Sequence, residues 1–192
     1  MVYEGKINNK KILSWEMWGI LFIFLVGAFF HFIFELSGEN LAVGLFGAVN
    51  ESIWEQIKIG FWPAFIWALI EFFIWGKKTK NFIFAKGLSF VLIGLLITGI
   101  YYASVSLGIE NLAVDISNFF ISILIAQVIS YRLMLVQKNQ VVLSIIGGIL
   151  IIASIAAFSL LSYYPPDCPI YQDPISGGYG IFPAEHMSGW GF

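Results

Sequence analysis

Residues 31–63 read HFIFELSGENLAVGLFGAVNESIWEQIKIGFWP, and this stretch joins the end of one long apolar run to the start of the next. It places ionisable side chains at the edge of segments that are otherwise apolar and of membrane-spanning length. Because a charged group is costly to bury in lipid, each of these side chains needs a structural or functional explanation. The stretch therefore predicts both a membrane-spanning fold and the position of a polar site.

The composition of the whole chain points the same way. Of its 192 residues, 59% are hydrophobic, 18% are aromatic and only 11% are charged, and the mean hydropathy is +0.85. A soluble domain has a charged fraction of about 25%. We predict a multi-pass protein of the cell membrane whose residues 1–192 form a single transmembrane domain in contact with the lipid bilayer.

Five apolar runs are each long enough to cross a bilayer as a helix. None shows the two-residue alternation of a membrane strand, so the predicted fold class is an all-α bundle of five transmembrane helices. The runs cover approximately residues 17–36, 57–75, 88–107, 116–135 and 142–163. Between the first two, the apolar part of segment 37–56 is too short to cross, so it is expected to lie in the interface or to be re-entrant.

The basic residues predict an orientation, because cytoplasmic loops of membrane proteins carry an excess of Lys and Arg. All but one of the ten Lys and Arg residues fall before the first run, between the second and third, or around the turn between the fourth and fifth. These regions, including the N-terminus, are expected to be cytoplasmic. The loops 37–56 and 108–115 and the tail 164–192 contain acids but no Lys or Arg, which predicts an acidic outer surface. Lys58, the exception, is expected to pair with Glu55.

Two ionisable residues lie near the outer end of the first run. His31 and Glu35 are four residues apart and therefore share one face of a helix. A carboxylate beside an imidazole suits proton transfer, cation binding or metal ligation. The alternative is a hydrogen-bonded pair that fastens this helix to a neighbour.

Residues 50–56, NESIWEQ, begin the second helix and have two explanations. Ser52 and Glu55 fit a capping box, Asn50 is a suitable cap, and acids are favourable at a helix N-terminus. However, Glu51 and Glu55 lie one helical turn apart, and such a pair of carboxylates could bind a cation or share a proton. Both explanations remain open from the sequence.

Further polar and small residues are assigned to packing. Asp115 and Asn118 open the fourth helix as cap residues and add acid to the outer side. Glu16 and Glu71 lie at the cytoplasmic ends of the first two helices, where an interfacial salt bridge with Lys86 is expected. Small residues four apart, in pairs that predict close helix packing, are Gly94 and Thr98, Gly99 and Ala103, and Ser144 and Gly148.

The tail from 163 to 183, YYPPDCPIYQDPISGGYGIFP, is too aromatic and too weakly charged for a disordered segment. Prolines end the fifth helix, and Gly177–Gly178 allows a tight turn. We expect the tail to fold over the outer mouth of the bundle as a lid and to bring Asp173 towards Glu35 and Glu51. A surface loop resting on the lipid headgroups is the alternative. Cys168, the single cysteine, is expected to be an unpaired thiol.

Several motifs resemble the DUF6512 family of uncharacterised small bacterial integral membrane proteins. They are His31 to Glu35 with Ser37-Gly38, Leu45-Phe46, Val49-Asn50-Glu51-Ser52, Trp54-Glu55, Phe61-Trp62-Pro63 and, in the tail, Pro165-Pro166, Pro169, Asp173-Pro174 and Gly178-Tyr179-Gly180. The resemblance implies a fold and no activity. The family pattern has His where this chain has Gln56 and Asp167. This chain keeps only His31 and His186, which disfavours zinc and favours a site of carboxylates and amides.

The leading functional hypothesis is an outer acidic pocket, between the outer ends of the first, second and fourth helices, that binds or transports a cation, a proton or a small polar solute. One alternative is a membrane-embedded, metal-assisted hydrolase or transferase acting on lipid-linked substrates, and another is a structural or partner-binding subunit. The sequence has no phosphate loop and no basic groove, so nucleic acid is not an expected partner. Candidate ligand-binding residues are His31, Glu35, Asn50, Glu51, Glu55, Asp115 and Asp173.

Overall fold

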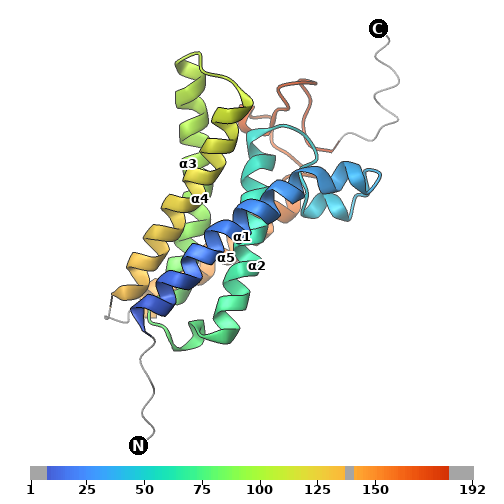
Figure 1. The fold of residues 1–192 in the computed structure, drawn as a ribbon. Helices are drawn as coiled ribbons and strands as arrows, with labels where there is room; N and C mark the ends of the chain where they lie inside the picture. Colours follow the sequence, from blue (N-terminus) through green and yellow to red (C-terminus); the bar gives the residue numbers. More distant parts are fainter. Residues whose placement is uncertain (1–7, 137–140, 182–192) are drawn as a thin grey trace, which may run out of the picture.

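The computed structural model describes residues 8–136 and 141–181. Its five long helices are α1 (Asn9–Leu36), α2 (Ile53–Ile74), α3 (Phe82–Ser106), α4 (Leu112–Leu135) and α5 (Val141–Leu160), with short 3-10 turns η1 (Val43–Leu45), η2 (Gly76–Lys78) and η3 (Pro169–Tyr171) (Figure 1). All five are long and apolar enough to cross a membrane. In the described residues the only β-type pairing is an isolated bridge between Gln172 and Tyr179. The predicted all-α, five-helix fold is confirmed.

The helices extend beyond the apolar runs from which they were predicted. α1 begins at Asn9 and α3 at Phe82, six or more residues before the predicted starts at 17 and 88, whereas α5 ends at Leu160 and not at 163. Polar caps explain the early starts of α1 and of α4, which begins at Leu112 and not at 116. The Asn8 side chain accepts a hydrogen bond from the backbone N–H of Lys10, and that of Asn111 accepts one from Val114. Such caps satisfy the free N–H groups of a first turn, so a helix continues outside its apolar part.

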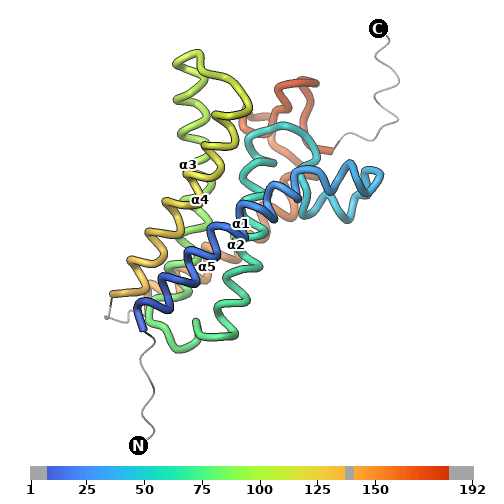
Figure 2. The backbone as a smooth tube through the Cα atoms, viewed as in Figure 1, coloured from blue at the N-terminus to red at the C-terminus, as the bar shows by residue number. Residues whose placement is uncertain are grey.

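The helices pack as a bundle in which α3 contacts both α4 and α5, and α1 contacts α2 and α4. The tube view shows α3 and α4 running side by side, while α1 diverges from α4 and crosses in front of α2 (Figure 2). The apolar core at the centre contains fully buried side chains from every helix but the fifth: Ile23, Phe61, Ile93, Ile97 and Ile123. α5 adds Phe158, which stacks on Phe61, and otherwise keeps much of its apolar surface exposed, as expected for a lipid-facing helix.

The segment between α1 and α2 doubles back along the end of α1 (Figure 1). Gly38 and Glu39 adopt the left-handed conformation, with φ of 71° and 60°, and reverse the chain. The returning segment then contacts α1: the N–H of Ala48 donates a hydrogen bond to the Phe30 carbonyl at 3.1 Å. Gly44 and Gly47 are buried in this turn. The apolar stretch 41–49 is thus folded against the helices, which brings Asn50 and Glu51 to the end of the bundle.

Candidate functional site

The candidate site lies where the end of α1 meets the beginnings of α2 and α4. Nε2 of His31 on α1 lies 3.5 Å from Oε2 of Glu51, just before α2, so the two form an ion pair when the imidazole is protonated, and their side chains are 34% and 44% exposed. The sequence suggested Glu35 as the carboxylate beside His31. Glu35 lies exposed in the last turn of α1, and its charge acts on His31, but the contact that the structure gives His31 is with Glu51. His31 therefore links α1 to the start of α2 through Glu51.

A cleft of about 290 Å³ opens between α1, α2 and α4 at this end. One polar side chain from each helix lines it, namely His31, Gln56 and Asp115. All three come from the helical turns nearest the connecting loops. The other lining side chains are apolar and include the deeper positions: Phe24, Ala28, Phe32, Ile59, Leu112, Ile116 and Phe119. The cleft is thus amphipathic, with a polar mouth and an apolar interior.

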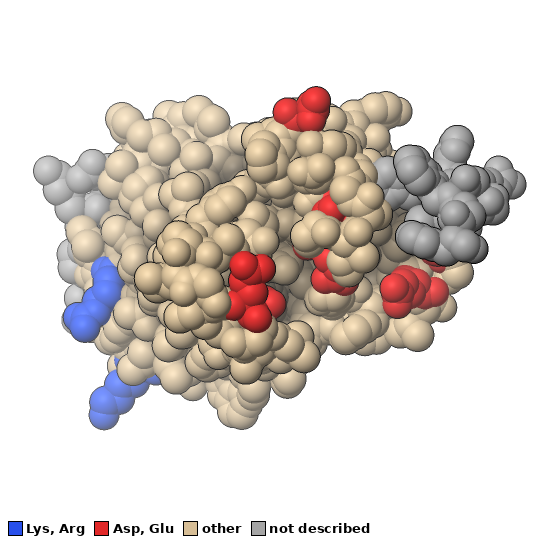
Figure 3. Space-filling view, turned by 90° about the horizontal axis from the view of Figure 1, so that it is seen from above, with Lys and Arg blue, Asp and Glu red and all other residues tan. Residues whose placement is uncertain are grey.

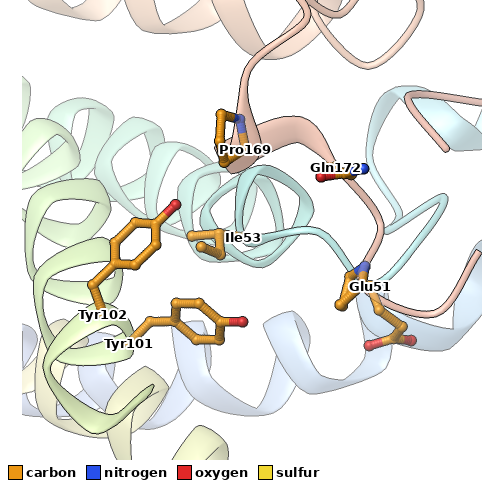
Figure 4. A pocket seen from close by; sticks show the side chains of 7 residues that line it. Glu51, Ile53, Tyr101, Tyr102, Pro169 and Gln172 are labelled. Atoms are coloured by element: carbon orange, nitrogen blue, oxygen red, sulfur yellow. The ribbon is translucent and has the colours of Figure 1, made fainter. Parts of the chain in front are cut away.

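Glu51 also borders a second pocket, of about 210 Å³, on the side of α3 and the tail. Figure 4 shows Tyr101 and Tyr102 of α3 on one side of this pocket and Pro169 and Gln172 of the tail on the other, with Ile53 between them. The hydroxyl of Tyr101 points towards the side on which Glu51 lies. Glu51 therefore lines this second pocket and also contacts His31, which lines the cleft.

Glu55, a predicted ligand, is buried and fully engaged within the protein. It forms an ion pair with Lys58, as predicted from their spacing, and accepts hydrogen bonds from the Ser162 hydroxyl at 2.6 Å and the Val49 N–H at 3.1 Å. Only half of the predicted capping box is present. The Ser52 hydroxyl accepts from the N–H of Glu55, but the N–H of Ser52 donates to Asn50. Glu55 therefore fastens the start of α2 to Ser162, just after the end of α5.

The tail approaches the site as predicted, through Asp173. This carboxylate is 7% exposed and accepts a hydrogen bond from the backbone N–H of Glu51 at 3.3 Å. It also accepts two from Ser176, one of them from the hydroxyl at 2.5 Å. The amide of Asn50 donates to the Gly180 carbonyl at 2.9 Å. Asn50 and Asp173 therefore hold the tail against the start of α2.

The tail carries its own polar contact at Asp167. A hydrogen bond with this carboxylate raises the pKa of the Tyr179 phenol above its ordinary value. At Tyr163 the pKa of the phenol is raised by burial and by the negative charge of Glu55, and its hydroxyl donates to the Leu41 carbonyl at 2.5 Å. Both phenols therefore remain neutral donors at physiological pH, and they fix the path of the tail.

Asn118 is not a cap. α4 begins at Leu112, so Asn118 lies two turns inside the helix, where it is 3% exposed. Its amide donates to the Ile97 carbonyl of α3 at 3.0 Å and accepts from the Ser122 hydroxyl. In the sequence Asn118 resembles a cap because the apolar run begins at 116, four residues after the helix begins.

The end of the molecule that carries the site is acidic. Viewed from above, separate Asp and Glu groups are spread over this face, and Lys and Arg side chains are visible only at its margin (Figure 3). Within residues 8–136 and 141–181, no group of three or more His, Cys, Asp and Glu side chains is arranged to hold a metal ion. Glu185 and His186 lie outside the described residues.

A second polar cluster was underestimated from the sequence. Lys86 lies between Glu16 and Glu71 as predicted, but the three residues are buried, with 2%, 2% and 0% of their surfaces exposed. The early helix starts are the reason, because they place Glu16 two turns inside α1 and Lys86 one turn inside α3. The polar residues Asn9 to Lys11, which continue the helix before the apolar run, were the signal that could have revealed it.

Fold and site together define a helical bundle with five helices able to cross a membrane and a cluster of ionisable groups at one end. The chain belongs to DUF6512, a family of unknown function, whose family model matches residues 3–181. No curated protein and no solved structure matches the chain. The resemblance inferred from the motifs of residues 31–63 and of the tail is confirmed.

Proposed function

We propose that this protein is a multi-pass protein of the cell membrane that binds a small organic cation in the cleft between α1, α2 and α4. The observation that carries the proposal is the position of Asp115, a carboxylate at the polar mouth of an otherwise apolar cleft. A protonated amine with an apolar body fits such a cleft, because its charge meets the carboxylate while its body lies among the apolar side chains.

The charge of Asp115 supports a cationic ligand over a neutral one. In the part of the chain that the structure describes, no Lys or Arg lies within ion-pair distance of Asp115. The carboxylates of Glu110 and Glu51 are close enough to repel its negative charge. A cation bound at Asp115 offsets this repulsion, whereas an anion adds to it.

The remaining lining residues fit the same ligand. Gln56 offers an amide oxygen to an N–H donor, and His31 is positioned by Glu51 at the edge of the cleft. The rings of Phe24 and Phe119 offer apolar surface to the body of the ligand, and aromatic faces also attract cations. The excess of Lys at the other end of the bundle supports an outer position for the cleft, from which a cation outside the cell has direct access.

Calorimetric titration of the protein in lipid nanodiscs tests this proposal. The probe is benzylammonium, and benzyl alcohol and benzoate serve as neutral and anionic compounds of similar shape. We expect benzylammonium to bind most tightly. Asp115→Asn should weaken its binding by a factor of about 10 or more, since a hydrogen bond to a charged group contributes about 1.5–3 kcal/mol.

Glu39→Gln is the matched control, because Glu39 is an exposed carboxylate that does not line the cleft. It should leave the affinity unchanged. Equal affinity for benzylammonium and benzyl alcohol, or an Asp115→Asn variant that binds like the wild type, would overturn the proposal.

A further inference from the structure

The buried cluster of Glu16, Lys86 and Glu71 lies at the opposite end of the bundle from the cleft. The ammonium of Lys86, on α3, lies 2.6 Å from Glu16 Oε1 of α1 and 2.5 Å from Glu71 Oε2 of α2. Each of the three residues has 2% or less of its surface exposed. One ammonium therefore holds two carboxylates inside the bundle.

The charges of this cluster do not balance. With all three groups ionised, two carboxylates and one ammonium carry a net charge of −1, and an uncompensated charge in a dry interior is strongly unfavourable. Around the cluster, α2 contributes the indole of Trp67, which lies beside Glu71. α5 has no ionisable residue along its length. α4 contributes Gln127, Ser130, Tyr131 and Arg132, of which Arg132 is exposed and forms no ion pair with the cluster in the described chain.

A cavity beside the cluster provides a second observation. It measures about 340 Å³. Its polar lining residues are Glu16, Gln127, Tyr131 and Arg132, and the rest of its lining is apolar: Leu13, Met17, Ile20 and Val128. Gln127 is 2% exposed, and within the described residues its Nε2 has no hydrogen-bond partner. The cavity therefore presents a buried carboxylate and a buried donor that suit a small, polar, exchangeable species.

We propose that Glu16, Lys86 and Glu71 form a binding site for one proton, which exchanges with the cavity through Glu16. The bound proton converts one carboxylate to the neutral acid and leaves the other paired with Lys86, so the cluster becomes neutral. A metal cation fits less well, because the Lys86 ammonium already occupies the position between the two carboxylates. This site is separate from the cleft and does not depend on the ligand proposed there.

Infrared spectroscopy of the purified protein in nanodiscs tests the proposal through the C=O absorption of a protonated carboxyl group. We expect the wild type to show this absorption at neutral pH, to shift it in D2O, and to lose it as one proton per chain is released at high pH. Glu16→Gln and Glu71→Gln should each abolish the absorption, since either change leaves one carboxylate paired with Lys86. Glu51→Gln and Asp115→Asn, at the other end, should retain it.

A wild type without the absorption, or an absorption that survives in both Glu16→Gln and Glu71→Gln, would overturn the proposal. Loss of the absorption on addition of NaCl at constant pH would also overturn it, because a metal cation would then be the ligand. The two substitutions lie on different helices, so if one variant does not fold, the other still tests the proposal. The wild-type pH titration and D2O shift need neither variant.

Discussion

Lys58 is buried completely, and its surroundings match the chemistry of an ammonium group. Its three N–H donors have three acceptors: the Glu55 carboxylate, the Gly44 carbonyl at 2.8 Å and the Ser162 hydroxyl at 3.0 Å. These acceptors come from α2 itself, from η1 and from the turn that follows α5. A single charged side chain therefore joins three parts of the chain at the end of the bundle.

Removal of Lys58 should be more damaging than removal of the whole ion pair. Lys58→Met leaves the Glu55 carboxylate buried without a counter-charge, and we expect a loss of about 3–5 kcal/mol in the free energy of unfolding. Glu55→Gln combined with Lys58→Met should recover most of that loss. Unfolding in mixed detergent micelles measures both. A double variant no more stable than Lys58→Met would show that the charge of Glu55 is not the cause.

Residue spacing along one helix predicted only the local part of these contacts. Glu55 and Lys58, three residues apart, could be paired from the sequence. Ser162, 104 residues from Lys58, could not. The same limit explains why His31 was assigned to Glu35, its neighbour on α1, while its ion-pair partner Glu51 is brought to it by the reversed chain at Gly38 and Glu39.

At the scale of the elements, α3 and α5 approach each other most closely through two glycines. A Cβ on Gly87 would lie 2.5 Å from the carbonyl oxygen of Gly147, and a Cβ on Gly147 would lie 2.5 Å from Phe84 Cα. The small-residue pairs in the sequence suggested other positions. Gly99 and Gly148 have no atom within 4 Å of a Cβ in the described chain. Lipid and protein interior are similarly apolar, so sequence alone does not show which face of such a helix packs.

Gly147 and Gly148 offer a matched pair of substitutions. Gly147→Ala forces a Cβ against the backbone of α3, and we expect it to destabilise the protein by about 1–3 kcal/mol. Gly148→Ala should be neutral or stabilising by up to about 1 kcal/mol, because its Cβ enters open space and Ala favours a helix. Thermal unfolding in detergent compares the two. Equal effects would contradict the close contact of α3 with α5.

For the whole molecule, the number of helices was predictable because a bilayer sets the length of each apolar run. The residues at which the helices begin were not predictable, since caps such as Asn8 and Asn111 lie outside those runs. The polar residues of the sequence predict a site between the outer ends of the first, second and fourth helices. The amphipathic shape of the cleft was not predictable, because it depends on how α1, α2 and α4 pack.

The orientation of the molecule is testable with its single cysteine. Cys168 is exposed and lies in the tail, at the same end as the cleft. The distribution of Lys and Arg predicts that this end faces outward. A membrane-impermeant maleimide should therefore label Cys168 in intact cells, and Cys168→Ser should abolish the signal. Labelling that requires disruption of the membrane would contradict the predicted orientation.

The central claim is that the cleft receives a cation at Asp115, and the most direct measurement is a crystal structure with 4-bromobenzylammonium, located by the anomalous scattering of bromine. We predict a bromine peak among the apolar side chains near Phe24 and Phe119, with the ammonium within hydrogen-bond distance of the Asp115 carboxylate. An ordered molecule elsewhere with the cleft unoccupied, or an ammonium directed away from Asp115, would contradict the account.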